Sequence, residues 1–177
     1  MINRSLYAVV LVLLVGAAQL PAQTASPAKE KAPDPLAPLT WFVGGTWVSD
    51  VKAPSGEVTH VENRMRWAAN HQAVVFNVDF NREPHYYGAY VYNPASKQFE
   101  FYYTSSEGEL SKGTATADAD SKTLRQEFDI MHTNGSTGHL RSTIEREGND
   151  AYWLTVFMQK NGEWTQVFRI RYDRKAE

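Results

Sequence analysis

The side chains best suited to chemistry in this sequence are three histidines that stand beside predicted turns: His85, His132 and His139. In a succession of antiparallel strands, alternate turns lie at the same end of the sheet, and these three histidines fall beside one such set. Converging imidazoles can bind zinc or copper, or exchange protons near neutral pH. Opposite walls of a barrel would instead keep them apart as surface residues. We expect this second arrangement, with no catalytic residue and no metal ligand among them.

No sequence motif of a hydrolase accompanies these histidines. The chain has no Gly-x-Ser-x-Gly or His-Glu-x-x-His motif, no phosphate-binding loop, and no cysteine that could serve as a nucleophile. An enzyme with its site at the histidine-bearing end therefore stays only as an alternative.

Two amides are candidate interior groups. Asn63 alternates with apolar Val61 and Met65, and Gln166 alternates with Phe168, so strict alternation places both amides inside a sheet structure. A buried amide needs a hydrogen-bond partner. The two amides could bind each other, water or a ligand.

Ten segments rich in β-branched and aromatic residues predict strands that position these groups. They cover residues 46–52, 58–69, 72–81, 85–92, 98–105, 109–117, 123–132, 139–147, 151–159 and 164–174. Asn-Gly at 161–162 and similar turn signals separate them, and such short connections make consecutive strands antiparallel. A meander of ten strands leaves two exposed edges unless it closes. We therefore predict an all-β, roughly ten-stranded up-and-down barrel with a short N-terminal helical turn at 36–43, in preference to a sandwich or an open half-barrel.

Alternation along these strands gives a set of residues expected to contact a ligand inside the barrel. The set comprises Asn63, Trp67, Phe76, Tyr90, Tyr103, Phe128, His132 and Gln166. It predicts a barrel that binds a small hydrophobic or aromatic molecule. The alternative to a binding barrel or an enzyme is a structural or partner-binding domain with a filled core.

Three short motifs carry a resemblance to known proteins. They are WFVGGTW at residues 41–47, YYGAYVYNP at 86–94 and FRIRYDR at 168–174. In their order and spacing, the chain resembles bacterial lipocalin-like (calycin) barrel domains of unknown function from residue 36 to residue 175. The resemblance implies that Arg174, at the end of the last strand, covers Trp47 and closes one end of the barrel. A distant similarity to nitrobindin brings haem into consideration, but the histidine that binds haem there lies in the last strand, and 164–174 has none. We therefore expect no cofactor.

The first residues predict export. Arg4 precedes an apolar run from residue 6 to residue 20, which is too short for a membrane span and ends near Pro21 in small residues. We expect a signal peptide at 1–25, a flexible linker at 26–35 and the barrel domain at 36–177. The mature protein would then be periplasmic or extracellular, without a membrane span.

The charge of the chain is close to neutral. It has 20 acidic and 18 basic residues, and the basic residues are scattered along the strands rather than clustered. Nucleic-acid binding requires a concentrated basic surface. We therefore expect no nucleic-acid partner.

Overall fold

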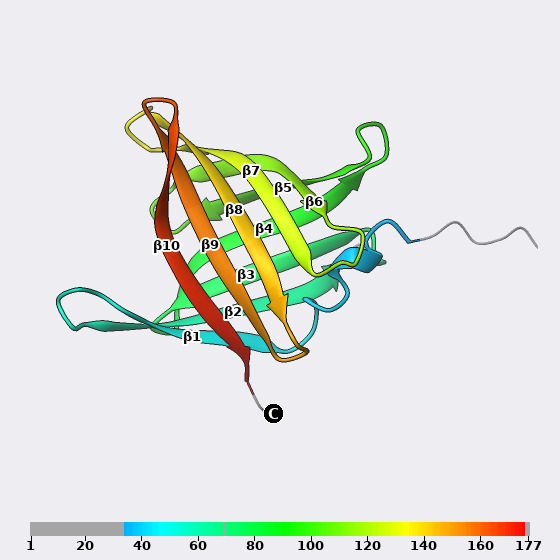
Figure 1. Cartoon of the computed structure of the whole chain (residues 1–177), viewed down its shortest axis with the longest axis horizontal. Helices are drawn as coiled ribbons and strands as arrows, with labels where there is room; N and C mark the ends of the chain where they lie inside the picture. The colour runs from blue at the N-terminus through cyan, green and yellow to red at the C-terminus, as the bar shows by residue number, and fades with distance from the viewer. Residues whose placement is uncertain (1–33, 69, 176–177) are drawn as a thin grey trace, which may run out of the picture. The chain divides into compact units, whose positions relative to one another are not determined.

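Ten antiparallel strands follow one another through the described part of the chain, residues 34–68 and 70–175, in this computed structural model (Figure 1). The predicted signal peptide and nearly all of the predicted linker lie outside these residues. A single 3₁₀ turn, η1 (Ala37–Leu39), precedes the strands β1 (Thr46–Lys52), β2 (Val58–Ala68), β3 (Ala73–Phe80), β4 (Glu83–Asn93), β5 (Gln98–Ser105), β6 (Leu110–Ala117), β7 (Thr123–Met131), β8 (Thr137–Glu147), β9 (Ala151–Lys160) and β10 (Glu163–Arg174).

The strands close into an up-and-down barrel. Each strand pairs with its neighbours along the chain, and β1 pairs with β10. This confirms the predicted fold class, and the predicted strand ends agree with the observed ones to within two residues. The sandwich and the open half-barrel are excluded. No helix in the described residues is long and apolar enough to cross a bilayer.

One end of the barrel is plugged by aromatic side chains around Trp47, and we call it the closed end. Trp47 is fully buried, donates from Nε1 to the carbonyl of Phe42 at 3.0 Å, and packs against Tyr152 with ring centroids 5.0 Å apart. The Arg174 guanidinium lies 4.3 Å from the centroid of the Trp47 ring and donates to the carbonyls of Gly44 and Trp41 at 2.8 and 3.0 Å. A charged group over an indole face is attracted by the ring quadrupole. The start of β1 and the end of β10 are thus joined through both backbone and side chains.

The closed end depends on a glycine. Gly45 has a φ of +77°, and a Cβ at this position would lie 3.0 Å from Nη1 of Arg174. Another residue here would both strain the backbone and displace the guanidinium. Gly45, the second glycine of the 41–47 motif, therefore makes room for Arg174.

A second glycine makes room inside the barrel. A Cβ on Gly88 would lie 2.5 Å from the Phe76 ring, from the carbonyl oxygen of Tyr102 and from the Cβ of Tyr103. No real Cβ could occupy that space, so aromatic side chains of β3 and β5 lie across the bare β4 backbone. This explains a glycine in the middle of a strand, where it otherwise weakens the sheet.

The end of the barrel opposite Trp47 is shaped by two β-bulges. Between β3 and β4, Val78 pairs with Tyr86 and Asp79 with Pro84, which leaves His85 as the extra residue. Between β9 and β10, Gln166 pairs with Phe157 and Phe168 with Val156, which leaves Val167 as the extra residue. A bulge reverses the inside–outside alternation on one side of it. We call this end, where the β3–β4, β5–β6, β7–β8 and β9–β10 turns lie, the mouth.

Candidate functional site

The interior of the barrel encloses a cavity of about 520 Å³. Its wall is formed by inward side chains of nine of the ten strands, all but β6, with Phe42 as part of the floor. The lining residues are Phe42, Val51, Thr59, Val61, Asn63, Met65, Phe76, Val78, Phe80, Tyr86, Tyr90, Phe101, Tyr103, Gln126, Phe128, Ile130, Leu140, Ser142, Ile144, Tyr152, Leu154, Val156, Phe168, Ile170 and Tyr172. A volume of this size is typical of small-molecule sites.

The wall of this cavity is uncharged. None of the described residues that line it is Asp, Glu, Lys, Arg or His. Tyrosine is its only titratable type, and burial raises the pKa of Tyr86 to about 12 and raises the pKa values of Tyr90, Tyr152 and Tyr172 further. These phenols are therefore neutral over the physiological pH range.

One polar chain crosses the cavity wall from β4 to β8. Gln126 Nε2 on β7 donates to the phenol oxygen of Tyr90 on β4 at 2.6 Å. Ser142 on β8 donates from its hydroxyl to the other end of the same amide. Because both ends of Gln126 are satisfied, this chain fixes the orientation of Tyr90 instead of leaving a free group for a ligand.

A second polar pair lies deeper, near the closed end. Asn63 Nδ2 on β2 donates to the phenol oxygen of Tyr152 on β9 at 3.1 Å. The other end of this amide, Oδ1, is buried and has no hydrogen-bond partner in the described part of the chain. A buried polar atom without a partner is uncommon and costs about 1 to 3 kcal/mol. Asn63 is therefore a buried polar group of the wall that has a hydrogen bond still to make.

Five of the eight residues expected to contact a ligand lie in this wall: Asn63, Phe76, Tyr90, Tyr103 and Phe128. Trp67 does not. Its side chain points to the same face of β2 as Asn63 and Met65, but it lies two residues beyond Met65, toward the closed end. There it is partly buried against the core and stacks on His71, with ring centroids 4.9 Å apart. Trp67 therefore helps to cover the floor and is not part of the cavity.

The expectation that Gln166 points inward is wrong. It is exposed and pairs with the outward-facing Phe157, because the bulge at Val167 shifts β10 by one residue relative to β9. Alternation counted back from Phe168 cannot detect such an insertion. Gln166 accordingly makes no bond with Asn63.

The three histidines near the mouth are held separately, and none of them lines the cavity. His85 stacks on Phe80, with centroids 4.1 Å apart, and its Nδ1 lies 3.0 Å from Ser106 Oγ. His132, expected to contact a ligand, instead has its Nδ1 2.5 Å from a carboxylate oxygen of Glu109.

His139 belongs to the outer surface rather than to the mouth. Its inward neighbour is Leu140, and its own ring nitrogens lie 2.7 Å from Asp129 and 3.1 Å from Glu127. The pKa of His139 is raised, chiefly by the hydrogen bond with Asp129. Across residues 34–68 and 70–175, no group of three His, Cys, Asp or Glu side chains is placed to hold a metal ion.

Sequence reasoning missed the wall residues that hydrogen-bond to Tyr90 and Asn63, directly or through one another: Gln126, Ser142 and Tyr152. The alternation rule was sufficient to find them. Gln126 shares its phase with Phe128, which was expected inside, and Tyr152 shares its phase with the apolar Leu154 and Val156 of the strand predicted at 151–159.

Comparison with known families gives one match, to the family described as "Protein of unknown function (DUF1579)", over residues 45–174. The match runs from the glycine beneath Arg174 to Arg174 itself, so it contains the whole barrel and both partners of the Trp47–Arg174 contact. No curated protein matches the chain.

Proposed function

The chain belongs to the DUF1579 family, and we propose that its barrel binds one neutral, largely apolar small molecule inside the cavity. The observation that carries this proposal is the interior space of about 520 Å³ with an aromatic, uncharged wall. A filled core would have no such space. The resemblance to lipocalin-like barrels supports the same conclusion, since lipocalins hold small ligands in the barrel interior.

The chemistry of the cavity wall determines which class of ligand fits it. A charged group moved into this interior would lose its hydration, at a cost of several kcal/mol, and would find no opposite charge there. Aromatic rings from Phe76, Tyr103 and Phe128 instead offer flat apolar contacts, and one end of the Asn63 amide offers a hydrogen bond. The best-matched ligand is thus an uncharged aromatic or alicyclic compound with one polar group that reaches the closed end.

N-phenyl-1-naphthylamine, a neutral aromatic probe that becomes fluorescent in apolar surroundings, tests this proposal. In the variant Val156→Trp, a large ring would enter the cavity, because Val156 is 6% exposed and lines its wall. We expect this variant to lose at least about tenfold in probe affinity, which corresponds to 1.4 kcal/mol. Circular dichroism would check that the variant folds, with Val156→Phe as a smaller substitution.

Val167→Trp is the matched control, since Val167 is the exposed bulge residue of the adjacent strand. We expect it to bind the probe like the unmodified chain. Equal affinity in both tryptophan variants would place the probe outside the cavity and contradict the proposal, as would absence of binding to the unmodified chain. Native mass spectrometry of protein purified from an exporting host would then identify the natural ligand as a stoichiometric adduct.

We also infer that the protein is exported. The basic Arg4, the apolar run at 6–20 and the small residues before the linker support a signal peptide ending at Ala22 or Ala25. Expression in a Gram-negative host, followed by osmotic shock and intact-mass measurement, tests this inference. A cytoplasmic product that retains its first 25 residues would contradict it.

A further inference from the structure

The closure of the barrel between β1 and β10 is much shorter than any other strand pairing. Only Trp47 with Arg174 and Val48 with Asp173 are paired, whereas each other neighbouring pair has at least six paired positions. Beyond Val48 the two strands diverge, and the hairpin formed by β1 and β2 projects away from β10 (Figure 1). Residues 49–52 of β1 therefore form an unpaired edge.

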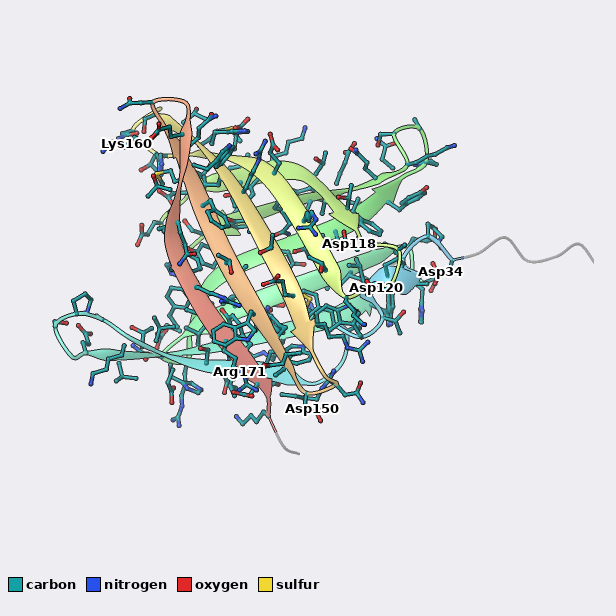
Figure 2. All side chains as sticks on the ribbon, in the orientation of Figure 1. Asp34, Asp118, Asp120, Asp150, Lys160 and Arg171 are labelled. Atoms are coloured by element: carbon teal, nitrogen blue, oxygen red, sulfur yellow. The ribbon has the colours of Figure 1, made fainter. Side chains whose placement is uncertain are left out.

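A hollow of about 540 Å³ lies between the diverging strands, and we call it the slot. It is lined by Val48, Ser49, Asp50, Val51, Lys52, His60, Trp153, Arg169, Ile170, Arg171 and Asp173. Arg171, labelled in Figure 2, marks the β10 side of the slot.

The slot and the interior cavity meet at two side chains. Val51 on β1 and Ile170 on β10 line both hollows. If the register of the two existing pairs continued, Val51 would stand directly opposite Ile170. The missing part of the strand pairing is thus a place where an outer hollow and the ligand cavity share the same two side chains.

Asp50 and Arg171, which face the slot from opposite sides, are each paired on their own side and do not bridge it. Asp50 lies 2.7 Å from His60 on the neighbouring strand β2, and Arg171 donates to Glu147 on β8 at 2.7 Å. The continued register would place Asp50 opposite Arg171, a favourable pair, but Lys52 opposite Arg169, a repulsive one. No ion pair between described residues holds the slot shut, so opening it further breaks no such bond.

The mouth, by contrast, carries a cluster of packed aromatic rings on its β3, β4 and β5 side. Phe80 stacks on His85, Phe80 meets Tyr86 edge-on at 5.7 Å, and Tyr86 meets Tyr103 at 5.3 Å. Passage of a ligand along this side of the mouth would require several packed rings to move together. Passage through the slot requires only that an already unpaired edge moves aside.

From these contacts, we propose that the slot between β1 and β10 is the portal through which the ligand enters and leaves the barrel. This inference rests on the proposed binding function, and it adds the route by which the ligand reaches the cavity. The outer part of the β1–β2 hairpin acts as a flap. It is anchored at Trp47 and, through β2, along β3 from Val61 to Ala68, and it is free at its turn.

Blocking either the slot or the mouth with a bulky protein plug distinguishes the two routes. Because the chain has no cysteine, a single introduced cysteine gives one attachment point in each variant. Lys52→Cys places a cysteine at the exposed rim of the slot, and Ser106→Cys places one in the β5–β6 turn at the mouth, beside His85. Neither position lines the cavity. Each variant is labelled with biotin-maleimide, and stopped-flow binding of N-phenyl-1-naphthylamine is measured with and without streptavidin.

We expect streptavidin on Lys52→Cys to slow both association and dissociation of the probe at least about tenfold and to leave its Kd unchanged, since blocking a route changes both rates together. On Ser106→Cys we expect less than about a twofold change in either rate. The opposite result, or equal slowing in the two variants, would overturn the portal. A weaker Kd with an unchanged dissociation rate would mean that the plug overlaps the binding site, which overturns it as well.

Failure of the binding proposal gives a different result. If the unmodified, unlabelled chain does not bind the probe at equilibrium, the cavity is not a binding site, and the portal is refuted together with it. Binding that Val156→Trp abolishes, combined with rates that the plug at position 52 does not affect, would overturn the portal alone.

Discussion

The two halves of the contact between β1 and β10 are made by the same two strands, yet one is held firmly and the other is open. In the closed half, Trp47 and Arg174 are joined by a strand pair, by the guanidinium over the indole ring and by hydrogen bonds to Gly44 and Trp41. In the open half, no strand pair is present between residues 49–52 and β10, and Asp50 and Arg171 each bind a partner on their own side. The difference teaches that a barrel of this size needs only a short, well-buried closure.

The closed half is held by the burial of its aromatic side chains rather than by a long run of paired residues. Trp47 is fully buried and contacts three other aromatic rings, whereas Val51 in the open half is only partly buried. Variants in the two halves should therefore affect different properties. Changes in the closed half should alter stability, and changes in the open half should alter the rates of ligand exchange.

The largest effect is expected for Trp47→Ala. The loss of a fully buried indole leaves a large void at the closed end and should lower the free energy of unfolding by about 3 to 5 kcal/mol. Urea denaturation followed by circular dichroism measures this change. Trp153→Ala is the control, because Trp153 lies on the outer face beneath Arg169 and is only partly buried. An equal loss in both variants would show that burial at the closed end is not what secures the barrel.

A smaller loss is expected for Arg174→Met. This variant keeps much of the side-chain bulk but loses the charge over Trp47 and two hydrogen bonds to carbonyls, so we expect a loss of about 2 kcal/mol. Thermal and urea unfolding would measure it, with probe affinity unchanged. Arg169→Met removes the comparable contact with Trp153 and should cost less than half as much. An unchanged melting temperature for Arg174→Met would contradict the closing role of this arginine.

In the open half, Lys52→Glu should partly close the slot. It replaces a repulsive pair with Arg169 by an attractive one in the continued register, and cross-strand charge pairs contribute about 0.2 to 1 kcal/mol. We expect probe association and dissociation to slow about twofold to threefold at low salt, and this slowing to disappear at high salt. Lys52→Gln, which removes the charge without adding the opposite one, should slow them less. Faster exchange in the glutamate variant would refute the register on which the portal rests.

The smallest expected effect is a change in the free energy of unfolding with pH, caused by His60 on the β2 strand of the flap. The hydrogen bond with Asp50 is the main cause that raises the pKa of His60 above its ordinary value of 6.5, with Glu62 adding to it and desolvation opposing it. A raised pKa in the folded state means that the stabilisation is complete below pH 6.5 and is lost as the pH rises through the folded-state value.

Because the side chains of His60 and Asp50 are 40% and 70% exposed, we expect this loss to be about 0.5 kcal/mol or less. Urea unfolding at pH 6 and pH 8 measures it. The variant His60→Asn should remove that part of the pH dependence. A difference that persists unchanged in His60→Asn would assign it to other groups.

The fold could be predicted from the sequence because its signals are local. Turn residues mark the hairpins, and alternation identifies the inward residues from Val74 to Tyr172. Five predicted cavity residues, from Asn63 to Phe128, lie in its wall for the same reason.

The sequence could not show the features that depend on an insertion or a missing contact. The bulges at His85 and Val167 each add one residue to a strand, and the second one turned Gln166 outward. The slot has no local signal at all, because residues 49–52 form a normal strand paired with β2 and lack only their second neighbour. Such an absence becomes visible only when the first and last strands are placed side by side.

The contact between Arg174 and Trp41 also bears on the order of folding, because the cavity is enclosed only after the first and last strands have met. Its two partners are 133 positions apart, and the arginine is the last residue of the last strand. Each hairpin can form as soon as its own two strands have been synthesised, but the ring of strands cannot close until β10 has been synthesised as well. Closure is thus a non-local event that follows the local ones, and contacts of such long sequence separation form slowly. A chain that ends before Asp173 would lack both pairs between β1 and β10, and would keep its hairpins without a closed ring around the cavity.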